Sequence, residues 1–215
     1  MTHPDLSRRN LLLASAGLLI GCQRSSSGGP PVTRTAYAAH PSPPLPTPTP
    51  PSPHATETCE VTAANIEGPF YKAGAPERAR LVQRQRGVPL VVEGIVRDAD
   101  CRPIPGAWLD VWHADHEGGY DNDGFGLRGR LRADRVGRYR LETIVPGHYL
   151  NGPTYRPAHI HVKLFAPGFR PLTTQLYFPE DPYNEGDPFI VDSLVMDVGQ
   201  GRGRRQAHFD FSLAR

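Results

Sequence analysis

Residues 159–164 read His-Ile-His-Val-Lys-Leu, so polar and apolar side chains alternate strictly along them. A period of two predicts a half-buried β-strand, because successive side chains of a strand point to opposite faces. His159 and His161 would then share one face, with their Cβ atoms roughly 6–7 Å apart. Two neutral imidazoles at that spacing can reach one metal ion. A polar strand face that happens to carry two histidines gives the same pattern.

Other short segments rich in β-branched or alternating residues are separated by turns of Gly, Pro and Asp. With the histidine segment, the predicted strands cover residues 89–96, 107–113, 137–143, 158–165, 172–178 and 208–213. Residues 98–106, 116–129 and 149–157 are predicted turns or loops. The pattern predicts an all-β fold, an antiparallel β-sandwich with long loops. Trp108 and Trp112 are predicted core residues.

Residues 1–22 have the features of an export signal and not of a folded element. Arg8 and Arg9 form a twin arginine, followed by an apolar run too short to span a bilayer as a helix. The run ends at Gly21-Cys22, which resembles a lipobox, and Cys22 is the predicted site of lipidation. We expect an exported protein, in the cell envelope or outside the cell, that contacts a membrane only through such a lipid anchor. A helix packing on the folded domain is the alternative.

Residues 23–58 are rich in Ser, Thr, Gly and Pro and are predicted to form a disordered linker. The folded domain is predicted to cover residues 59–215. Its two cysteines, Cys59 and Cys101, are predicted to form a disulfide in an oxidising compartment, with two free thiols as the alternative. The formal net charge of +2 gives no electrostatic reason to expect a nucleic-acid partner.

Two histidines alone leave a metal ion under-coordinated, so further ligands would have to come from the loops. Tyr120 follows Gly118-Gly119, and Tyr149 follows Pro146-Gly147-His148, and turns are where binding residues concentrate. The remaining histidines of the domain that precede the pair are predicted to be structural or exposed: His113, His116 and His148. A copper site built from His113 and the histidine pair is one alternative.

Residues 60–190 contain several short segments that match the motifs of one protein family, in the same order along the chain. They are 67–71, 112–115 with 119–120, 137–139 with 143–147, Tyr149, 156–161 and 174–178. Together these segments resemble the intradiol ring-cleavage dioxygenases, the family of catechol 1,2-dioxygenase and protocatechuate 3,4-dioxygenase.

The resemblance implies a mononuclear non-haem Fe(III) centre with four protein ligands. By match, the ligands are Tyr120, Tyr149, His159 and His161. Phenolate is a hard anionic donor that suits ferric iron, and the ion itself favours the ionised form of tyrosine. Arg156 matches the family's active-site arginine, Gln175 matches a polar neighbour of the iron, and Tyr149 would also accept a substrate proton. The expected rim of the substrate pocket is formed by Asn65, Ile66, Pro69, Phe70 and Tyr71.

The implied activity is Fe(III)-dependent cleavage of a catecholic ring by O₂ to a muconate-type diacid. The expected partners are a small catecholic substrate and O₂, and an oligomer stays open. The alternative is a non-catalytic, exported β-sandwich binding module on a stalk.

Overall fold

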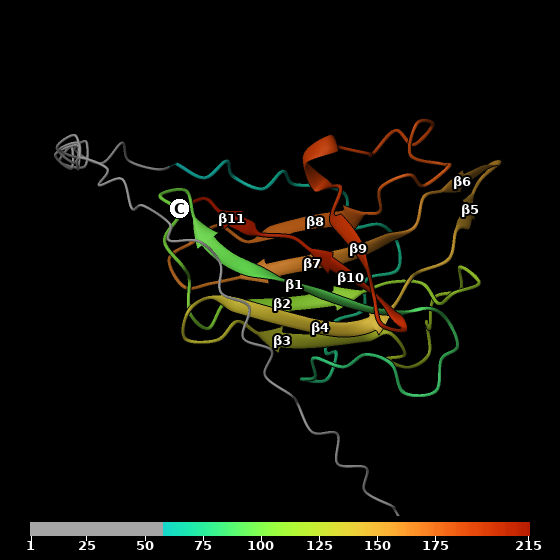
Figure 1. Cartoon of the computed structure of the whole chain (residues 1–215), viewed down its shortest axis with the longest axis horizontal. Coiled ribbons are helices and arrows are strands. Elements are labelled where there is room, and N and C mark those ends of the chain that lie inside the picture. The colour runs from blue at the N-terminus through green and yellow to red at the C-terminus, as the bar shows by residue number, and fades with distance from the viewer. Residues whose placement is uncertain (1–57) are drawn as a thin grey trace, which may run out of the picture. The chain divides into compact units, whose positions relative to one another are not determined.

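The computed structural model describes residues 58–215, which form a sandwich of two β-sheets (Figure 1). The predicted signal of residues 1–22 with Cys22, and the predicted linker up to residue 57, lie outside the described residues. Within residues 58–215, no helix is long and apolar enough to cross a membrane.

The first sheet is built around one long central strand. Its strands are β1 (Pro89–Asp98), β4 (Arg138–Ile144), β9 (Asp197–Gly201), β10 (Arg204–His208) and β11 (Phe211–Leu213). β4 pairs antiparallel with β1, whereas β10 and β11 pair with β1 in parallel and in one continuous register. The pairing with β1 is interrupted between β10 and β11. There, Phe209 O lies so close to β1 that a Cβ at Gly94 would be 1.8 Å from it. Only glycine fits at that position of β1.

The second sheet is antiparallel throughout and carries the histidine pair. Its order is β3 (Arg128–Arg132), β2 (Trp108–Trp112), β7 (His159–Phe165) and β8 (Leu172–Tyr177). Outside the two sheets lie the hairpin β5–β6 (Tyr149–Asn151 and Thr154–Arg156) and the 3₁₀ turn η1 (Asp192–Leu194).

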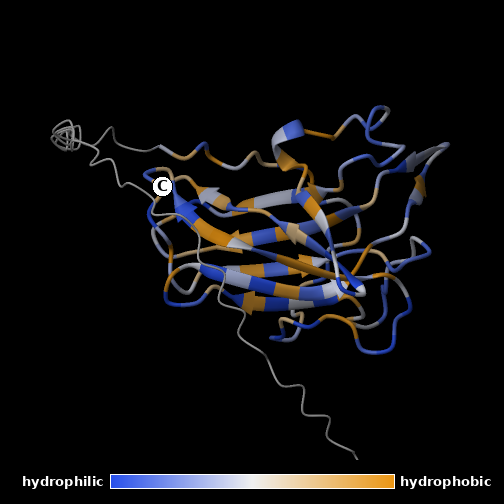
Figure 2. Cartoon of the chain, in the orientation of Figure 1, coloured by the Kyte–Doolittle hydropathy of each residue, from blue (hydrophilic) through white to orange (hydrophobic). Residues whose placement is uncertain are grey.

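The core lies between the two sheets. Apolar segments run along the strands in Figure 2, and Val92 of the first sheet and Leu109 and Ile160 of the second are fully or almost fully buried. The outer face of the second sheet is also buried at the end that carries the histidine pair, although it is polar there. Trp112, His161 and Gln175 lie there beneath loops, and each is at most 1% exposed.

The predicted all-β sandwich is confirmed, with differences in detail. Strands β3, β9 and β10 fall in segments where no strand was predicted, because Arg, Gly and Gln hide the apolar alternation. The loop predicted over residues 149–157 contains the β5–β6 hairpin, and the last strand begins at Phe211 and not at residue 208. The prediction that Trp108 is a core residue is wrong. Trp108 is half-buried on the outer face, where the guanidinium carbons of Arg132 and Arg130 lie 4.0 and 4.6 Å from its ring centre.

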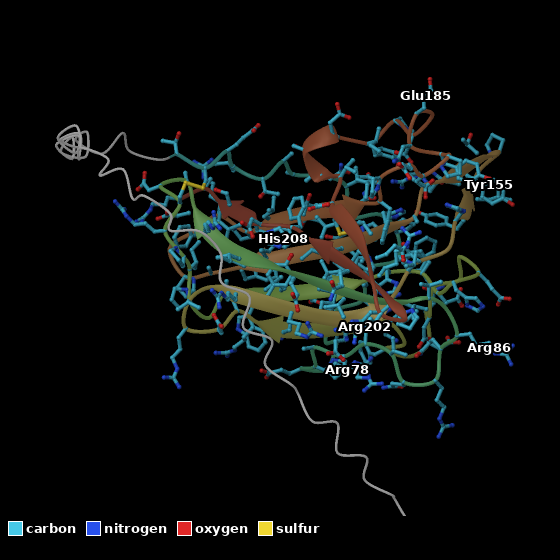
Figure 3. The ribbon with its side chains drawn as sticks, viewed as in Figure 1. Arg78, Arg86, Tyr155, Glu185, Arg202 and His208 are labelled. Atoms are coloured by element: carbon cyan, nitrogen blue, oxygen red, sulfur yellow. A yellow bond between two sulfur atoms is a disulfide. The ribbon has the colours of Figure 1, made fainter. Side chains whose placement is uncertain are left out.

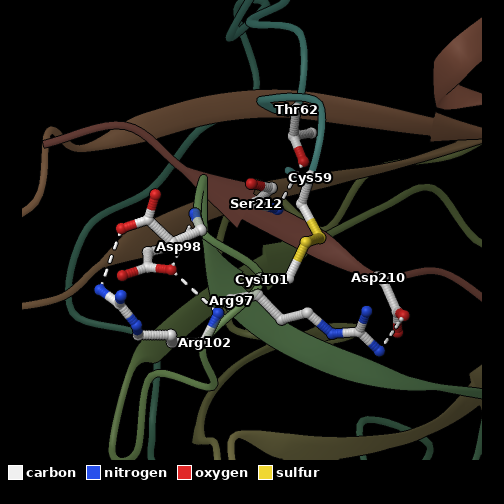
Figure 4. The surroundings of a disulfide bond; sticks show 9 residues. Cys59, Thr62, Arg97, Asp98, Cys101, Arg102, Asp210 and Ser212 are labelled. Carbon is white, nitrogen blue, oxygen red and sulfur yellow. Dashed lines mark hydrogen bonds and ion pairs between the residues drawn. A yellow bond between two sulfur atoms is a disulfide. The ribbon is translucent and has the colours of Figure 1, made fainter. Parts of the chain in front are cut away.

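A disulfide ties the start of the described chain to the turn after β1 (Figure 4). Cys59 is bonded to Cys101, with the two Cα atoms 5.1 Å apart and a separation of 42 in sequence. Cys59 N also donates to Ala99 O at 2.9 Å, and Thr62 N donates to Ser212 O at 3.0 Å. The N-terminal arm therefore begins firmly attached to the first sheet.

Removing this disulfide should lower the free energy of unfolding by up to about 4 kcal/mol, because the cross-link restricts a long loop of the unfolded chain. Adding a reductant should lower the melting temperature of the wild-type domain. The variant Cys59→Ala/Cys101→Ala should melt at the lower temperature and should not respond to the reductant. Equal melting temperatures with and without reductant in both proteins would contradict this role.

Candidate metal centre

Strand β7 presents His159 and His161 on the covered outer face of the second sheet. They are 2% and 1% exposed, respectively. Burial disfavours the charged imidazolium, so it lowers the pKa of His159 to about 4 and that of His161 well below its usual value. Both rings are therefore neutral near pH 7, which is the form that binds metal ions.

The hydrogen bonds of His159 determine which of its nitrogens can act as a ligand. Its Nδ1 lies 2.7 Å from Pro157 O, and a carbonyl only accepts, so Nδ1 carries the proton. The lone pair then belongs to Nε2, which lies 3.2 Å from Nε2 of His161. Nδ1 of His161 is buried without a hydrogen-bond partner. The two Nε2 atoms thus converge on a shared position beside β7.

Two loops bring the predicted tyrosines to the same place. Tyr120 lies in the loop after β2, and Tyr149 begins β5. The ring centres of Tyr120 and Tyr149 are 5.6 Å apart, Tyr149 is 5.6 Å from His159, and Tyr120 is 6.3 Å from His161. The structure therefore brings together the four predicted ligands from three separate segments.

The donor set fits a ferric ion. Tyr120 Oη is buried and has no hydrogen-bond partner, which is costly for a polar atom unless a further group binds it. Burial raises the pKa of Tyr120 and of Tyr149, so each phenol needs a nearby cation to ionise at neutral pH. In residues 58–215, no three His, Cys, Asp or Glu side chains gather as metal ligands.

Aromatic rings and one tight turn wall off the four side chains. Phe70 stacks on Tyr120 with ring centres 4.2 Å apart, and Trp112 stacks on His161 at 4.7 Å. The turn at Gly68, whose φ is +71°, passes over His161 so closely that a Cβ there would lie 3.4 Å from the ring. These contacts keep bulk water away from the imidazoles.

Arg156 and Gln175 form a polar network beside Tyr149. Arg156 Nη1 donates to Tyr149 Oη at 3.4 Å, and Nη2 donates to Gln175 Oε1 at 2.9 Å. Gln175 Nε2 donates in turn to Asn65 Oδ1 and to Ile66 O, at 3.2 and 3.0 Å. The predicted arginine, glutamine and asparagine therefore act as one connected group.

The other predicted rim residues lie at different places. Ile66 and Pro69 are exposed, and Ile66 lines a shallow cavity of about 350 Å³ together with Ala64, Asn65 and Phe189. Tyr71 instead lies on the outer face of the sheet, where its hydroxyl donates to Asp110 Oδ2 at 3.1 Å. A larger cavity, of about 630 Å³ along β1 and β4, contains none of the predicted site residues.

Three charged residues near the site were missed by sequence reasoning. Arg128 donates to Phe70 O at 2.5 Å and to Asp121 O at 3.0 Å, so it joins the two loops that bring Phe70 and Tyr120 together. Asp181 accepts from His148 Nε2 and Asp187 from Arg156 Nε. The only available signal was that both aspartates precede proline in one loop, which indicates turns and not partners.

The other histidines take structural or surface positions. Both ring nitrogens of His113 are occupied, Nδ1 by Ala114 O at 2.7 Å and Nε2 by Thr143 Oγ1 at 2.6 Å. His113 thus has no free nitrogen for the copper site considered above. His116 is exposed, and His148 is paired with Asp181 at 2.8 Å.

Comparisons with known proteins give one consistent result. A family model described as "Dioxygenase" matches residues 66–214. Chlorocatechol 1,2-dioxygenase of Rhodococcus opacus is 37% identical over 168 residues, which are 65% of this chain and 65% of that protein. Catechol 1,2-dioxygenase of Acinetobacter baylyi is 36% identical over 165 residues, 64% of this chain and 53% of that protein.

A solved structure covers the described domain almost completely. It is the dioxygenase domain of a dioxygenase and carbohydrate-binding fusion protein from the cellulolytic bacterium Streptomyces sp. SirexAA-E, with 44% identity and a TM-score of 0.68. The match covers 72% of this chain and 99% of that one. The chain belongs to the intradiol ring-cleavage dioxygenase family. It spans about half to two thirds of the length of the curated relatives named above.

The burial of His113 should make stability depend on pH. Burial lowers the pKa of His113 from 6.5 to about 4, so between these values the unfolded chain binds a proton that the folded chain does not. Stability therefore falls as the pH falls, by about 3 kcal/mol between pH 7 and pH 4. Urea unfolding should show that the free energy of unfolding falls more steeply with falling pH in the wild type than in His113→Gln, because the variant lacks the imidazole.

The other buried histidines titrate in both proteins and cancel in this comparison. Parallel profiles for the wild type and His113→Gln would contradict the assignment.

Proposed function

We propose that this protein is an exported, Fe(III)-dependent intradiol dioxygenase that cleaves a catecholic ring between its two hydroxylated carbons. The other substrate would be O₂ and the product a muconate-type diacid. The observation that carries the proposal is the convergence of Tyr120, Tyr149, His159 and His161, with two Nε2 atoms 3.2 Å apart and the Tyr120 hydroxyl buried without a partner.

Bound Fe(III), held by these four side chains, would chelate the two catechol oxygens and make the ring reactive towards O₂. The chain contributes the surroundings. The neutral imidazoles supply nitrogen donors without adding charge, and the two phenols supply the anionic oxygens that offset part of the ferric charge. Phe70 and Trp112 pack on these rings and exclude water, which strengthens the electrostatic interactions inside the site.

Tyr149 would accept a substrate proton, and Arg156 would stabilise the negative charge that develops. We assign Tyr149 Oη as the atom that accepts a substrate hydroxyl proton, because it lies at the wall of the site and 3.4 Å from Arg156 Nη1. The fixed cation of Arg156 stabilises negative charge on the phenolate and on the substrate ring. Gln175 holds the opposite side of the guanidinium through Nη2.

The residues expected to form the rim of the pocket support a substrate class. Ile66, Pro69 and Phe70 are apolar and Asn65 is neutral, which favours an uncharged catechol or a hydroxyquinol over a carboxylated ring. The relatives named chlorocatechol, catechol and hydroxyquinol 1,2-dioxygenase support the same class. A non-catalytic binding module is a weaker proposal, because it gives no reason to bury the Tyr120 hydroxyl without a partner.

The iron-loaded domain should be coloured, because tyrosinate bound to ferric iron absorbs visible light. Tyr120→Phe should shift or abolish the visible band, because it removes a donor whose hydroxyl has no other partner. Tyr155→Phe is a matched control, because Tyr155 lies exposed on the β5–β6 hairpin (Figure 3) and its hydroxyl is not part of the site. The measurement is the visible spectrum at equal iron content.

Oxygen uptake with a panel of catechols, with ring opening followed by absorbance, tests the reaction itself. Wild type and Tyr155→Phe should consume O₂ in step with ring opening, and Tyr120→Phe should lose most of this activity. A colourless wild-type protein that carries a full complement of iron would contradict the proposal. Copper held by histidines alone would give spectra that do not respond to Tyr120→Phe.

A further inference from the structure

The Nε atom of Arg156 donates to the buried carboxylate of Asp187, which takes no part in the reaction proposed above. We propose that Asp187 is a positioning residue, which fixes Arg156 between Tyr149 and Gln175. The catalytic consequence of this contact rests on the proposed function, whereas the contact itself does not. Asp187 lies in the loop after β8, 31 residues after Arg156, so only the fold brings the two together.

The pair is buried and both carboxylate oxygens are occupied. The side chains of Arg156 and Asp187 are 5% and 0% exposed. Asp187 Oδ2 accepts from Arg156 Nε, and Asp187 Oδ1 accepts from Phe189 N at 2.7 Å. The second bond closes a turn across Pro188 and holds the carboxylate in one orientation.

Three sides of the guanidinium are engaged, and this determines where the remaining donor points. Nε is bound by Asp187, Nη2 by Gln175 at 2.9 Å, and the ring of Phe189 lies 4.8 Å from the guanidinium carbon. Nη1 is left to face Tyr149 Oη at 3.4 Å. Because a guanidinium is planar and rigid, fixing Nε and Nη2 also fixes the direction of Nη1.

Charge balance gives a second reason for the pair. A buried arginine needs a counter-charge, since removing one partner of a buried ion pair leaves an uncompensated charge. Among the residues that the structure describes, Asp187 is the carboxylate paired with Arg156, and Gln175 supplies only a neutral acceptor. Without Asp187, the guanidinium would gain by turning towards water, away from Tyr149.

A double-mutant cycle on the iron-loaded protein separates positioning from general stability. Asp187→Asn should lower kcat by about 10- to 100-fold, the cost typical of losing an outer partner of a metal site. The visible band should persist in this variant, because all four proposed ligands remain. If Asp187 acts through Arg156, the double variant Asp187→Asn/Arg156→Gln should be no slower than Arg156→Gln alone. Asp187→Glu, which keeps the charge, should recover part of the lost kcat.

A second double-mutant cycle, on the metal-free protein, tests the contact between Asp187 and Arg156 without relying on the reaction. Arg156→Gln strands the carboxylate and should lower the melting temperature, and adding Asp187→Asn should restore part of it. Asp98→Asn is the matched control, because Asp98 is also a buried aspartate paired with an arginine, Arg215, but lies beside the disulfide (Figure 4). Its effects on kcat and on melting temperature should add to those of Arg156→Gln.

Additive effects of Asp187→Asn and Arg156→Gln in both cycles would overturn the proposal, as would an unchanged kcat in Asp187→Asn. A colourless, inactive wild-type protein that still shows coupled melting temperatures would overturn the proposed function and leave the Asp187–Arg156 contact supported.

Discussion

The burial of a polar sheet face is the constraint on which the rest of the site depends. One face of the β3-β2-β7-β8 sheet packs in the core, and one end of the opposite face, with Trp112, His161 and Gln175, is closed off by loops. Polar atoms in such a place are costly unless each has a partner. Most of them find one in the described chain, whereas Tyr120 Oη, His161 Nδ1 and Trp112 Nε1 do not. The unmatched Tyr120 hydroxyl, beside the converging Nε2 atoms of His159 and His161, therefore marks where a further group would restore the balance.

The N-terminal arm links the stability of the domain to the closure of the site. It is bonded to the first sheet at Cys59 and to β8 through Asn65, whose N donates to Thr173 O at 2.8 Å. Beyond Asn65 it passes over His161 at Gly68 and places Phe70 against Tyr120. This segment has no long strand of its own, yet it is held in place because it is bonded to the sheets at one end and packs on proposed ligands at the other.

The sequence predicted the part of the site that depends on local pattern. Strict alternation places His159 and His161 on one face of a strand whatever the rest of the chain does. Their positions in Gly-rich turns made Tyr120 and Tyr149 candidate ligands, and the resemblance to a family identified them as ligands. Strand β3 was missed because its sequence, Arg-Gly-Arg-Leu-Arg, has one apolar residue, and it pairs through backbone bonds to β2. Asp187 was missed because its partner lies across the fold.

Two aspartates of the loop after β8 make the same pair of interactions. Asp181 and Asp187 each precede a proline, and each uses Oδ1 to accept the backbone N–H two residues further on. Each then has Oδ2 free for a segment of the site: Asp181 accepts from Ala158 N beside His159, and Asp187 accepts from Arg156. Between them the loop tip is exposed at Glu185 (Figure 3). The tip can therefore vary in sequence, whereas the two Asp-Pro turns have to keep their geometry for β7 and Arg156 to keep theirs.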